Sequence, residues 1–306
     1  MVVRRAGAGE IRAPSIKITK GRARDQSMIS KPYRVCIIAP PGYIHSSCFL
    51  EVAMLMKASL LSLDADCDVM FNELADNRTN IILGAHLMKH GDYLRAYRYV
   101  PYQLEQLSER EGAFSENLSA VLRGAVDVWD YSRENIAFCA KRGIAARYLP
   151  VGYHEILEQI RPAATKDTDV LFYGSSGPRR QPVLDSLKSK DGMAFRHLFG
   201  VYGRDRDAAI AHARIVLNLH HYSTRIFEAV RVSYLLNNRC CVVSEESTVY
   251  PYEGVDLTLV AYEEIVRMCL DLLKDPAEID RRAGRAYEQF KSKYRMTELL
   301  GAVLDQ

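Results

Sequence analysis

The chain has 306 residues, of which 48% are hydrophobic and 26% are charged, and its formal net charge is +3. This length exceeds one ordinary hydrophobic core and suits two domains of about 130 residues each. No apolar run approaches the roughly 20 residues that span a bilayer, and the basic N-terminus lacks the apolar segment of a secretory signal. We therefore expect a cytoplasmic globular protein.

The seven cysteines are scattered along the chain, and none forms a C-x-x-C pair. Most of them lie in apolar runs, which indicates buried, reduced thiols rather than disulfides. Their scatter also gives no support to a zinc site.

The first 31 residues carry a local excess of positive charge. Eight of them are Lys or Arg and two are acidic, and the segment is otherwise rich in Gly, Ala and Ser. This composition is typical of disordered chain, so we expect residues 1–31 to be a disordered basic tail. Its charge suits weak contact with anionic lipid or non-specific contact with nucleic acid, which would place the protein peripherally at the inner membrane face.

Strand-like and helix-like segments alternate through residues 32–150. Ordered structure is expected to begin near Tyr33 with a strand over 34–39, followed by a Pro-Pro-Gly break and a helix over about 46–63. Ser132 is predicted to cap a helix that starts at Arg133. The further strands expected in this half cover residues 68–71, 80–83, 126–131 and 145–149, with an edge or loop segment at 100–102.

The same alternation restarts after Pro150. A helix is predicted from about Thr224 to Leu236, and helices fill the chain from Tyr262 to its end. The strands expected in this half cover residues 169–173, 195–199, 215–218, 240–244 and 257–260. The fold class is therefore α/β, with two Rossmann-like domains of mainly parallel sheet, 32–150 and 151–295, that face a cleft. Ligands of such sheets bind beyond the carboxyl ends of the strands.

Residues 218–231 carry the most suggestive polar pattern in the chain, NLHHYSTRIFEAVR. A buried strand is predicted to end at Asn218, and a helix is predicted to open near Ser223 or Thr224. The unpaired N–H groups of a first helical turn can bind a diphosphate, and Arg225 in that turn would add a bidentate cation.

The Glu228 carboxylate lies one turn further along the same predicted helix. It can accept two hydrogen bonds from the vicinal hydroxyls of a ribose, and it would be a poor partner for phosphate. Judged on these residues alone, an equally weighted alternative makes Glu228 a helix-stabilising acid and makes His220 and His221 ordinary loop residues.

This segment resembles the nucleotide-sugar site of GT-B glycosyltransferases. Retaining members carry two glutamates eight positions apart, the second of which holds the ribose, and Glu228 matches that second position. His220 stands where those enzymes have the first glutamate, which leaves inversion or retention open. Residues 242–245 resemble the apolar strand after the donor helix. The pattern N-L-H with a following F-E-x-x-R resembles a bacterial branch of polysaccharide-associated glycosyltransferases.

A second match lies at residues 169–174, which resemble the first strand of the GT-B donor domain. The strand ends in Gly174, so that a donor can approach the backbone closely. Arg179 resembles the basic residue that these enzymes aim at the donor phosphates, and Arg180 is the neighbouring alternative. On the residues alone, the alternative is that both belong to a solvated basic helix start. The resemblance implies a donor-binding set of Gly174, Ser175, Arg179, His220, His221, Tyr222, Ser223, Thr224, Arg225 and Glu228.

Two histidines of the first half are candidate catalytic residues. His45 follows the first strand, at the position where many inverting GT-B enzymes keep a base, and His86 follows another strand. A neutral imidazole could accept the proton of the acceptor hydroxyl, although each is as well explained as a structural histidine. We favour His45 as the base in an inverting displacement. Glu105 is a weaker candidate for acceptor contact.

The end of the chain, residues 296–306, is predicted to contain a helix with an apolar stripe. GT-B proteins commonly return such a helix to the N-terminal domain, so we expect this crossing here. The alternative is a helix that caps its own domain.

Other catalytic classes lack their fingerprints. The chain has no G-x-G-x-x-G after a strand, no P-loop and no G-x-S-x-G nucleophile elbow. Acidic pairs at 64–66 and 127–130 do not fit the layout of metal-dependent GT-A transferases. We therefore expect no metal or other cofactor, with Arg179, Arg225 and the helix terminus neutralising the leaving diphosphate.

The resemblance thus implies a metal-independent glycosyltransferase that uses a nucleotide-sugar donor. Its acceptor would be a glycan, a lipid-linked sugar or another hydroxyl compound of surface-glycan synthesis, and no specific nucleic-acid partner is expected. The alternatives are a nucleotide-sugar epimerase of the same layout and a non-enzymatic nucleotide-sugar-binding protein.

Overall fold

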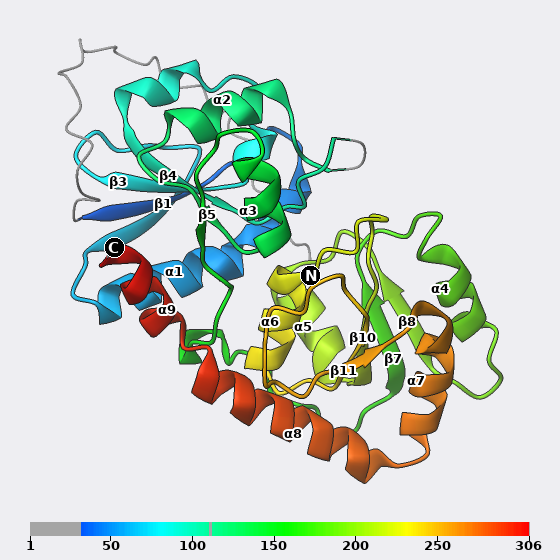
Figure 1. Cartoon of the computed structure of the whole chain (residues 1–306). Helices are drawn as coiled ribbons and strands as arrows, with labels where there is room; N and C mark the ends of the chain where they lie inside the picture. Colours follow the sequence, from blue (N-terminus) through cyan, green and yellow to red (C-terminus); the bar gives the residue numbers. More distant parts are fainter. Residues whose placement is uncertain (1–31, 110–111, 306) are drawn as a thin grey trace, which may run out of the picture.

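A computed structural model of the chain describes residues 32–109 and 112–305. The predicted basic tail, residues 1–31, lies outside the described residues. Each half of the chain forms an α/β unit around its own sheet, and the two units lie against each other (Figure 1).

The first unit contains six strands and the helices between them. These are β1 (Tyr33–Ile37), α1 (Leu50–Ser62), β2 (Cys67–Phe71), β3 (Thr79–Leu83), β4 (Arg98–Gln103), α2 (Glu116–Gly124), β5 (Trp129–Asp130), α3 (Arg133–Ala140) and β6 (Arg147–Tyr148). Short 3₁₀ turns precede α1 at Ile44–Phe49 and follow β3 at Ala85–Leu87 and Asp92–Ala96.

The second unit contains five strands, and its helices continue to the end of the chain. These are β7 (Thr168–Tyr173), α4 (Gln181–Lys188), β8 (Phe195–Leu198), α5 (Gly203–Ala211), β9 (Ala213–Asn218), α6 (Ala229–Asn237), β10 (Val242–Glu245), β11 (Thr258–Val260), α7 (Ile265–Leu273), α8 (Pro276–Lys293) and α9 (Met296–Leu304). Two 3₁₀ turns lie at Glu155–Leu157 and Tyr262–Glu264.

The strand orders are β2-β1-β3-β4-β5-β6 in the first sheet and β11-β10-β9-β7-β8 in the second. Every strand pairing within these sheets is parallel, which confirms the predicted fold class. Parallel strands need crossover connections, and the intervening helices and loops supply them. In each sheet the carboxyl ends of the strands lie along one edge, which is where ligands of such sheets bind.

Two sequence predictions about elements are corrected, and one is confirmed. The segment 100–102, expected at an edge or in a loop, belongs to β4, which lies between β3 and β5. The strand expected over 126–131 is reduced to two residues, Trp129 and Asp130. The predicted cap is confirmed, because the Ser132 side chain accepts a hydrogen bond from the Asn135 N–H at the start of α3.

One helical segment of the described chain, Ile44–Ser62, is long and apolar enough to cross a membrane by length and composition alone. This corrects the expectation that no run approaches that length. The segment is the 3₁₀ turn followed by α1, and Val52, Leu55, Met56 and Leu60 on α1 are buried against the first sheet and its neighbours. Its apolar composition is accounted for by this packing.

The chain passes between the two units twice, and the passages run side by side. Tyr153 donates its N–H to the Tyr294 carbonyl (2.7 Å), and Met296 donates its N–H to the Tyr153 carbonyl (2.8 Å). Gly152 allows this approach, because a Cβ there would lie 2.4 Å from the Tyr294 carbonyl oxygen. After the second passage, α9 packs on α1 of the first unit, where the red and blue helices adjoin in Figure 1.

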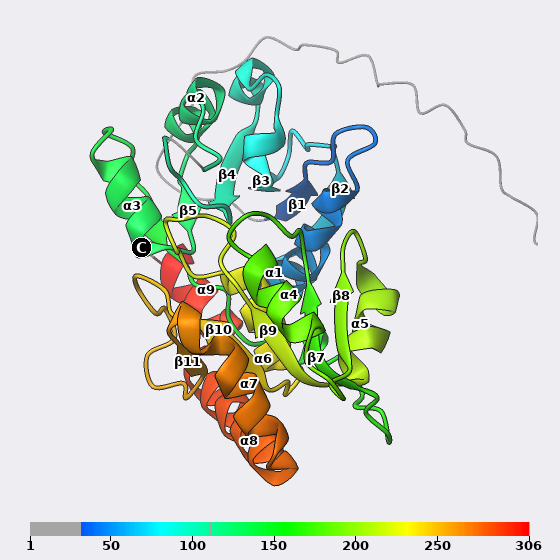
Figure 2. The same ribbon diagram turned by 90° about the vertical axis from the view of Figure 1, so that its right-hand side faces the viewer.

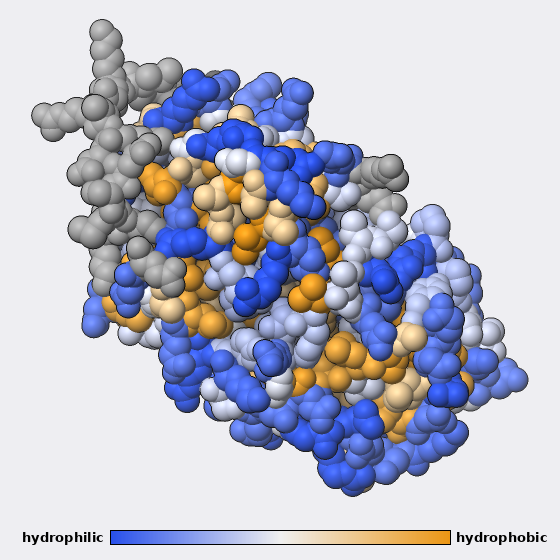
Figure 3. All heavy atoms as spheres, viewed as in Figure 1, coloured by the Kyte–Doolittle hydropathy of each residue, from blue (hydrophilic) through white to orange (hydrophobic). Residues whose placement is uncertain are grey.

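The hydrophobic core is continuous between the units. Its largest cluster runs from the α1 face of the first sheet through α9 to α6 and α8 of the second unit. Two smaller clusters lie on the outer faces, around α2 and α3 and around α4 and α7. Figure 2 shows the second unit turned toward the viewer, and the surface in Figure 3 is mainly hydrophilic with scattered apolar patches. The shared core fixes how the two sets of strand ends face each other.

Candidate functional site

A cavity of about 620 Å³ lies between the two units. Its walls are made by the segments that follow β1, β3, β4 and β5 in the first unit and β7, β8 and β9 in the second, together with the start of α6. These are the carboxyl ends of parallel strands, which is where an open α/β sheet binds ligands. A volume of several hundred cubic ångströms is typical of a small-molecule site.

The second unit lines this cavity with a buried ionic cluster centred on Glu228. Arg180 Nη2 lies 2.6 Å from Glu228 Oε1, and Arg231 Nη1 lies 3.1 Å from Glu228 Oε2. The backbone N–H of His221 also donates to Glu228 Oε1 (3.2 Å). Burial by itself raises the pKa of Glu228, but the adjacent Arg231 and Arg180 guanidinium groups outweigh it and lower the pKa. The carboxylate is therefore ionised, and the cluster carries one net positive charge.

Gly174 lies where β7 ends and leaves room for this cluster. Its φ of +136° is one that side chains rarely allow, and a Cβ there would lie 2.9 Å from Arg231 Nη2. Ser175 follows, and its carbonyl accepts a hydrogen bond from Arg180 Nη1 (2.9 Å). Both residues line the cavity, so the predicted strand-end glycine is brought to the site.

The two adjacent arginines point in different directions. Arg180 is 3% exposed and faces the cavity, and it also donates to the Leu219 carbonyl. Arg179 forms an ion pair with Glu245 instead, and its guanidinium lies 5.0 Å from the centre of the Tyr262 ring. Arg179 is not among the residues that line the cavity, so Arg180 is the one of these two arginines that reaches it.

The helix predicted from Thr224 begins instead at Ala229, and Glu228 is the residue just before it. Arg225 has a φ of +49° and is exposed, so Ser223, Thr224 and Arg225 form a turn in the loop rather than a first helical turn. None of these three residues lines the cavity. The helical first turn predicted at these residues is therefore wrong, and the helices whose starts face the cavity are α4, α5 and α6, at Arg180, Tyr202 and Glu228.

The two neighbouring histidines are also separated by the structure. His221 lines the cavity with Tyr222, and its Nδ1 lies 3.5 Å from Ser175 Oγ. His220 is fully buried behind the wall, where its N–H donates to Glu245 Oε2 and its Nε2 lies 3.1 Å from Ser247 Oγ. Burial lowers the pKa of His220 to about 4. His220 is thus a neutral structural residue of the loop.

The first unit brings His45, His86 and Glu105 to the opposite wall. His45 Nδ1 lies 2.6 Å from the hydroxyl oxygen of Tyr202, which belongs to the second unit. Burial lowers the pKa of His86 to about 4, so its imidazole is neutral at pH 7. Burial, and then the charge of Glu228, raise the pKa of Glu105 to about 7.

Three further ionic residues of the cavity, Glu51, Arg206 and Arg231, escaped the sequence analysis as functional candidates. Arg206 on α5 is 6% exposed and lies 2.7 Å from Glu51 on α1, so this buried ion pair joins the two units. The segment GRDRD around Arg206 looks like a solvated charged surface, and no sequence pattern marks its burial. Arg231 could have been found from its i, i+3 spacing to Glu228 on a helix.

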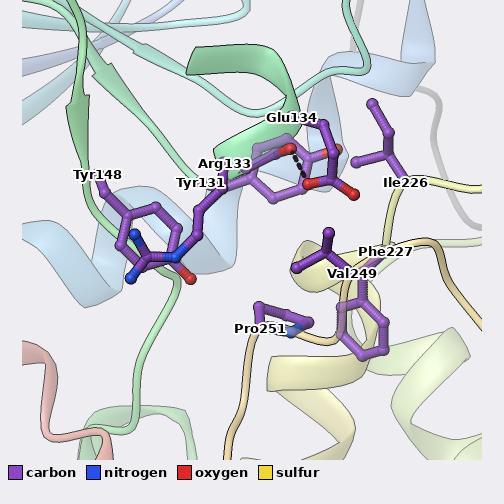
Figure 4. Close-up of a pocket in the computed structure, with 9 residues that line it drawn as sticks. Tyr131, Arg133, Glu134, Tyr148, Ile226, Phe227, Val249 and Pro251 are labelled. Atoms are coloured by element: carbon purple, nitrogen blue, oxygen red, sulfur yellow. Dashed lines mark hydrogen bonds between the residues drawn. The ribbon is translucent and has the colours of Figure 1, made fainter. Parts of the chain in front are cut away.

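A second, much smaller hollow lies near α3 (Figure 4). It is formed by Arg133, Tyr148 and their neighbours in the first unit, and by Phe227, Val249 and Pro251 in the second. Its volume of about 10 Å³ is at most that of one water molecule, so it cannot hold a substrate. Within residues 32–109 and 112–305, no group of three or more His, Cys, Asp or Glu is placed to hold a metal ion.

No protein-family model matches the sequence. The chain is similar to two uncharacterized proteins of Acanthamoeba polyphaga mimivirus. It is 30% identical to one of them over 159 residues, which are 49% of this chain and 21% of that protein. It is 30% identical to the other over 189 residues, which are 58% of this chain and 65% of that protein. The chain thus spans between a fifth and two thirds of the length of these relatives.

The fold is similar to that of solved glycosyltransferases. An alpha-glucosyltransferase in complex with UDP and a 13-mer DNA superposes with a TM-score of 0.59 at 10% identity, over 89% of this chain and 100% of that one. A S. aureus TarM variant in complex with UDP superposes with a TM-score of 0.52 at 10% identity, over 76% and 55% of the two chains. With its two parallel sheets and the cavity between them, the chain has the GT-B glycosyltransferase fold.

Proposed function

We propose that the chain is a glycosyltransferase that moves a sugar from a nucleotide-sugar donor to a hydroxyl acceptor in the central cavity. The observation that carries the proposal is the buried Arg180–Glu228–Arg231 cluster at the ends of β7 and β9 and the start of α6. A net positive cluster at strand ends suits a diphosphate. The alpha-glucosyltransferase and TarM structures of the same fold were solved with UDP.

In this proposal the donor diphosphate lies against Arg180 and Arg231, which replace the Arg179 and Arg225 of the sequence hypothesis. Their charge would neutralise the leaving group as its bond to the sugar breaks, so no metal is required. The Glu228 carboxylate has about four acceptor positions, and three donors already reach it. Glu228 therefore orients the two arginines and has one position left for a ribose hydroxyl.

The acceptor would enter along the first unit, where His45, His86 and Glu105 line the cavity. We propose a glycan or lipid-linked acceptor of surface-glycan synthesis on the basis of the sequence resemblance, and a cytoplasmic location on the basis of the scattered, unpaired cysteines. A weak membrane contact through residues 1–31 belongs to the same proposal.

The first test is a thermal-shift panel of nucleoside diphosphates and nucleotide sugars, with and without EDTA. A ligand at 100 times its dissociation constant should stabilise the protein by about 2.7 kcal/mol. The matching nucleotide sugar should then release free nucleoside diphosphate only when an acceptor is added. Conversion of the donor to an isomer without acceptor would favour the epimerase, and no stabilisation by any nucleotide would refute the donor site.

The second test separates the arginine that faces the cavity from a surface arginine of the same unit. Arg180→Gln should weaken nucleoside diphosphate binding about 10- to 100-fold, because a charge-assisted hydrogen bond contributes roughly 1.5–3 kcal/mol. Arg196→Gln, at an exposed position on β8, is the matched control and should leave binding unchanged. Equal affinities of the two variants by calorimetry would contradict the assignment.

A further inference from the structure

Hydrogen bonds fix the backbone of Glu105, which lies just after the carboxyl end of β4. Its carbonyl accepts hydrogen bonds from Asn135 Nδ2 (2.8 Å) and Gln103 Nε2 (3.3 Å). The next residue, Gln106, reaches across to the second unit, where its Nε2 donates to the Ile226 carbonyl (3.1 Å). The segment that carries Glu105 is therefore fixed on both sides, and its side chain enters the cavity from a rigid base.

Three acidic side chains line the cavity, and they differ in their partners. Glu51 is paired with Arg206, and Glu228 is paired with Arg180 and Arg231. In the part of the chain that the structure describes, no hydrogen bond or ion pair engages the Glu105 carboxylate. Glu105 is half-buried in the cavity wall, and a carboxyl group that is partly withdrawn from water without a partner is a functional candidate.

Among the described groups, no lysine or arginine lowers the pKa of Glu105, although three arginines line the same cavity. The charged group in electrostatic reach is Glu228, whose own charge is already balanced by two arginines. His86 lines the same cavity and is neutral, because burial lowers its pKa to about 4. The other titratable groups on which Glu105 acts are Tyr43, Cys48, Tyr131 and Tyr222, and burial raises the pKa of each of them. All four are therefore neutral at pH 7.

We propose that Glu105 is the general base that accepts the proton of the acceptor hydroxyl during sugar transfer. This inference rests on the proposed glycosyltransferase function. The acceptor oxygen forms the new bond to the anomeric carbon, and the bond from that carbon to the diphosphate oxygen breaks. The electron pair leaves with the nucleoside diphosphate, and the hydroxyl proton passes to the Glu105 carboxylate and then to solvent.

Glu105 suits this role better than the two histidines of the same wall. A group with a pKa of about 7 is well matched to proton transfer at neutral pH, whereas His86, with a pKa of about 4, is a weak base. One ring nitrogen of His45 already lies 2.6 Å from the Tyr202 hydroxyl. His45 therefore belongs to the contact between the units at this wall.

The test compares Glu105→Gln with Glu109→Gln in the full chain. Glu109 is a matched control, because it is 70% exposed and pairs with Arg142 at the surface. Glu105→Gln should lower kcat at least about 100-fold, since general bases contribute about 10²–10⁴ in rate. Its Kd for the nucleoside diphosphate should stay within threefold of wild type, and Glu109→Gln should match wild type in both.

The pH profile distinguishes a base from a structural residue. The kcat/KM of the wild type should fall on the acid side with an apparent pKa near 7, and Glu105→Asp should keep such a limb at reduced rate. Glu105→Gln should lose the limb. A kcat within threefold of wild type in Glu105→Gln, a tenfold weaker nucleotide Kd in that variant, or loss of the limb in His45→Gln instead would each overturn the proposal. Failure of the wild type to bind any nucleotide would refute the glycosyltransferase function itself.

Discussion

The two walls of the cavity are built on opposite principles. In the wall of the second unit, Glu228 is paired with both Arg180 and Arg231 through short ionic contacts, which leaves one net positive charge. In the wall of the first unit, Glu105 and His86 are enclosed without an ionic partner among the described residues, and burial shifts the pKa of both toward the neutral form. Ionic side chains that are paired keep a fixed charge that can bind a ligand. Titratable side chains without an ionic partner can exchange protons. The division matches a donor side and a reaction side.

The largest effect should come from breaking the paired wall. Glu228→Ala leaves Arg180 and Arg231 buried side by side without their carboxylate, which should cost about 3–5 kcal/mol of unfolding free energy. Urea denaturation measures this cost. Glu246→Ala, at an exposed position, is the control and should change little. If both variants lose the same amount, the cluster is not a buried ionic unit.

The next largest effect is expected for the ion pair between Arg206 of the second unit and Glu51 of the first unit. A double-mutant cycle with Arg206→Gln and Glu51→Gln should give a coupling energy of about 1–3 kcal/mol, because both side chains are buried. The exposed pair Arg239–Glu288, at 2.9 Å, should give less than about 1 kcal/mol in the same measurement. Similar couplings for the two pairs would contradict a buried link between the units.

A smaller effect should appear as a pH dependence of Glu105→Gln. Between pH 4.5 and about 7 the unfolded chain releases the Glu105 proton while the folded chain keeps it, so wild-type stability falls as pH rises. Glu105→Gln does not titrate there, so it should gain about 2 kcal/mol relative to wild type between pH 5 and 7.5. Denaturation curves at both pH values measure the gain. A gap that stays constant with pH would show that Glu105 is not held in the neutral form.

The smallest effect is expected for His86, and it has the opposite direction. Burial lowers the pKa of His86 to about 4. Between pH 6.5 and pH 4, His86 is therefore protonated in the unfolded chain and neutral in the folded chain. Wild-type stability should therefore fall by about 1.8 kcal/mol relative to His86→Gln when the pH is lowered from 7 to 5. His90→Gln, at an exposed position, should not change the pH profile. A profile of His86→Gln that matches wild type would contradict the burial of the imidazole.

The fold was largely predictable because both units follow a strict alternation of apolar strands and amphipathic helices. The errors arose where tertiary contacts override local pattern. Ile226 and Phe227 are buried and adjoin the apolar face of α6, so they extend its pattern backwards, although the helix begins only at Ala229. Proline is disfavoured in central strands, yet Pro101 lies in β4 between two partners.

The candidate site was only partly predictable for a similar reason. Glu228, Gly174 and Ser175 were identified from a spaced pattern that the fold preserves. The choice between Arg179 and Arg180 depends on the turn before α4, which sends one residue to the cavity and its neighbour to Glu245. The environment of Glu105 could not be inferred, because it depends on the second unit closing over the end of β4.

The paired passages of the chain at Tyr153 and Arg295 have a mechanical consequence. A single linker would let the two units rotate in any direction relative to each other. Two chain segments that are hydrogen-bonded side by side can bend together but resist twisting. If the cavity opens to admit a donor, the two units would then rotate about one axis. When the cavity closes, the arginines of the second unit and Glu105 of the first unit would return to the same relative position.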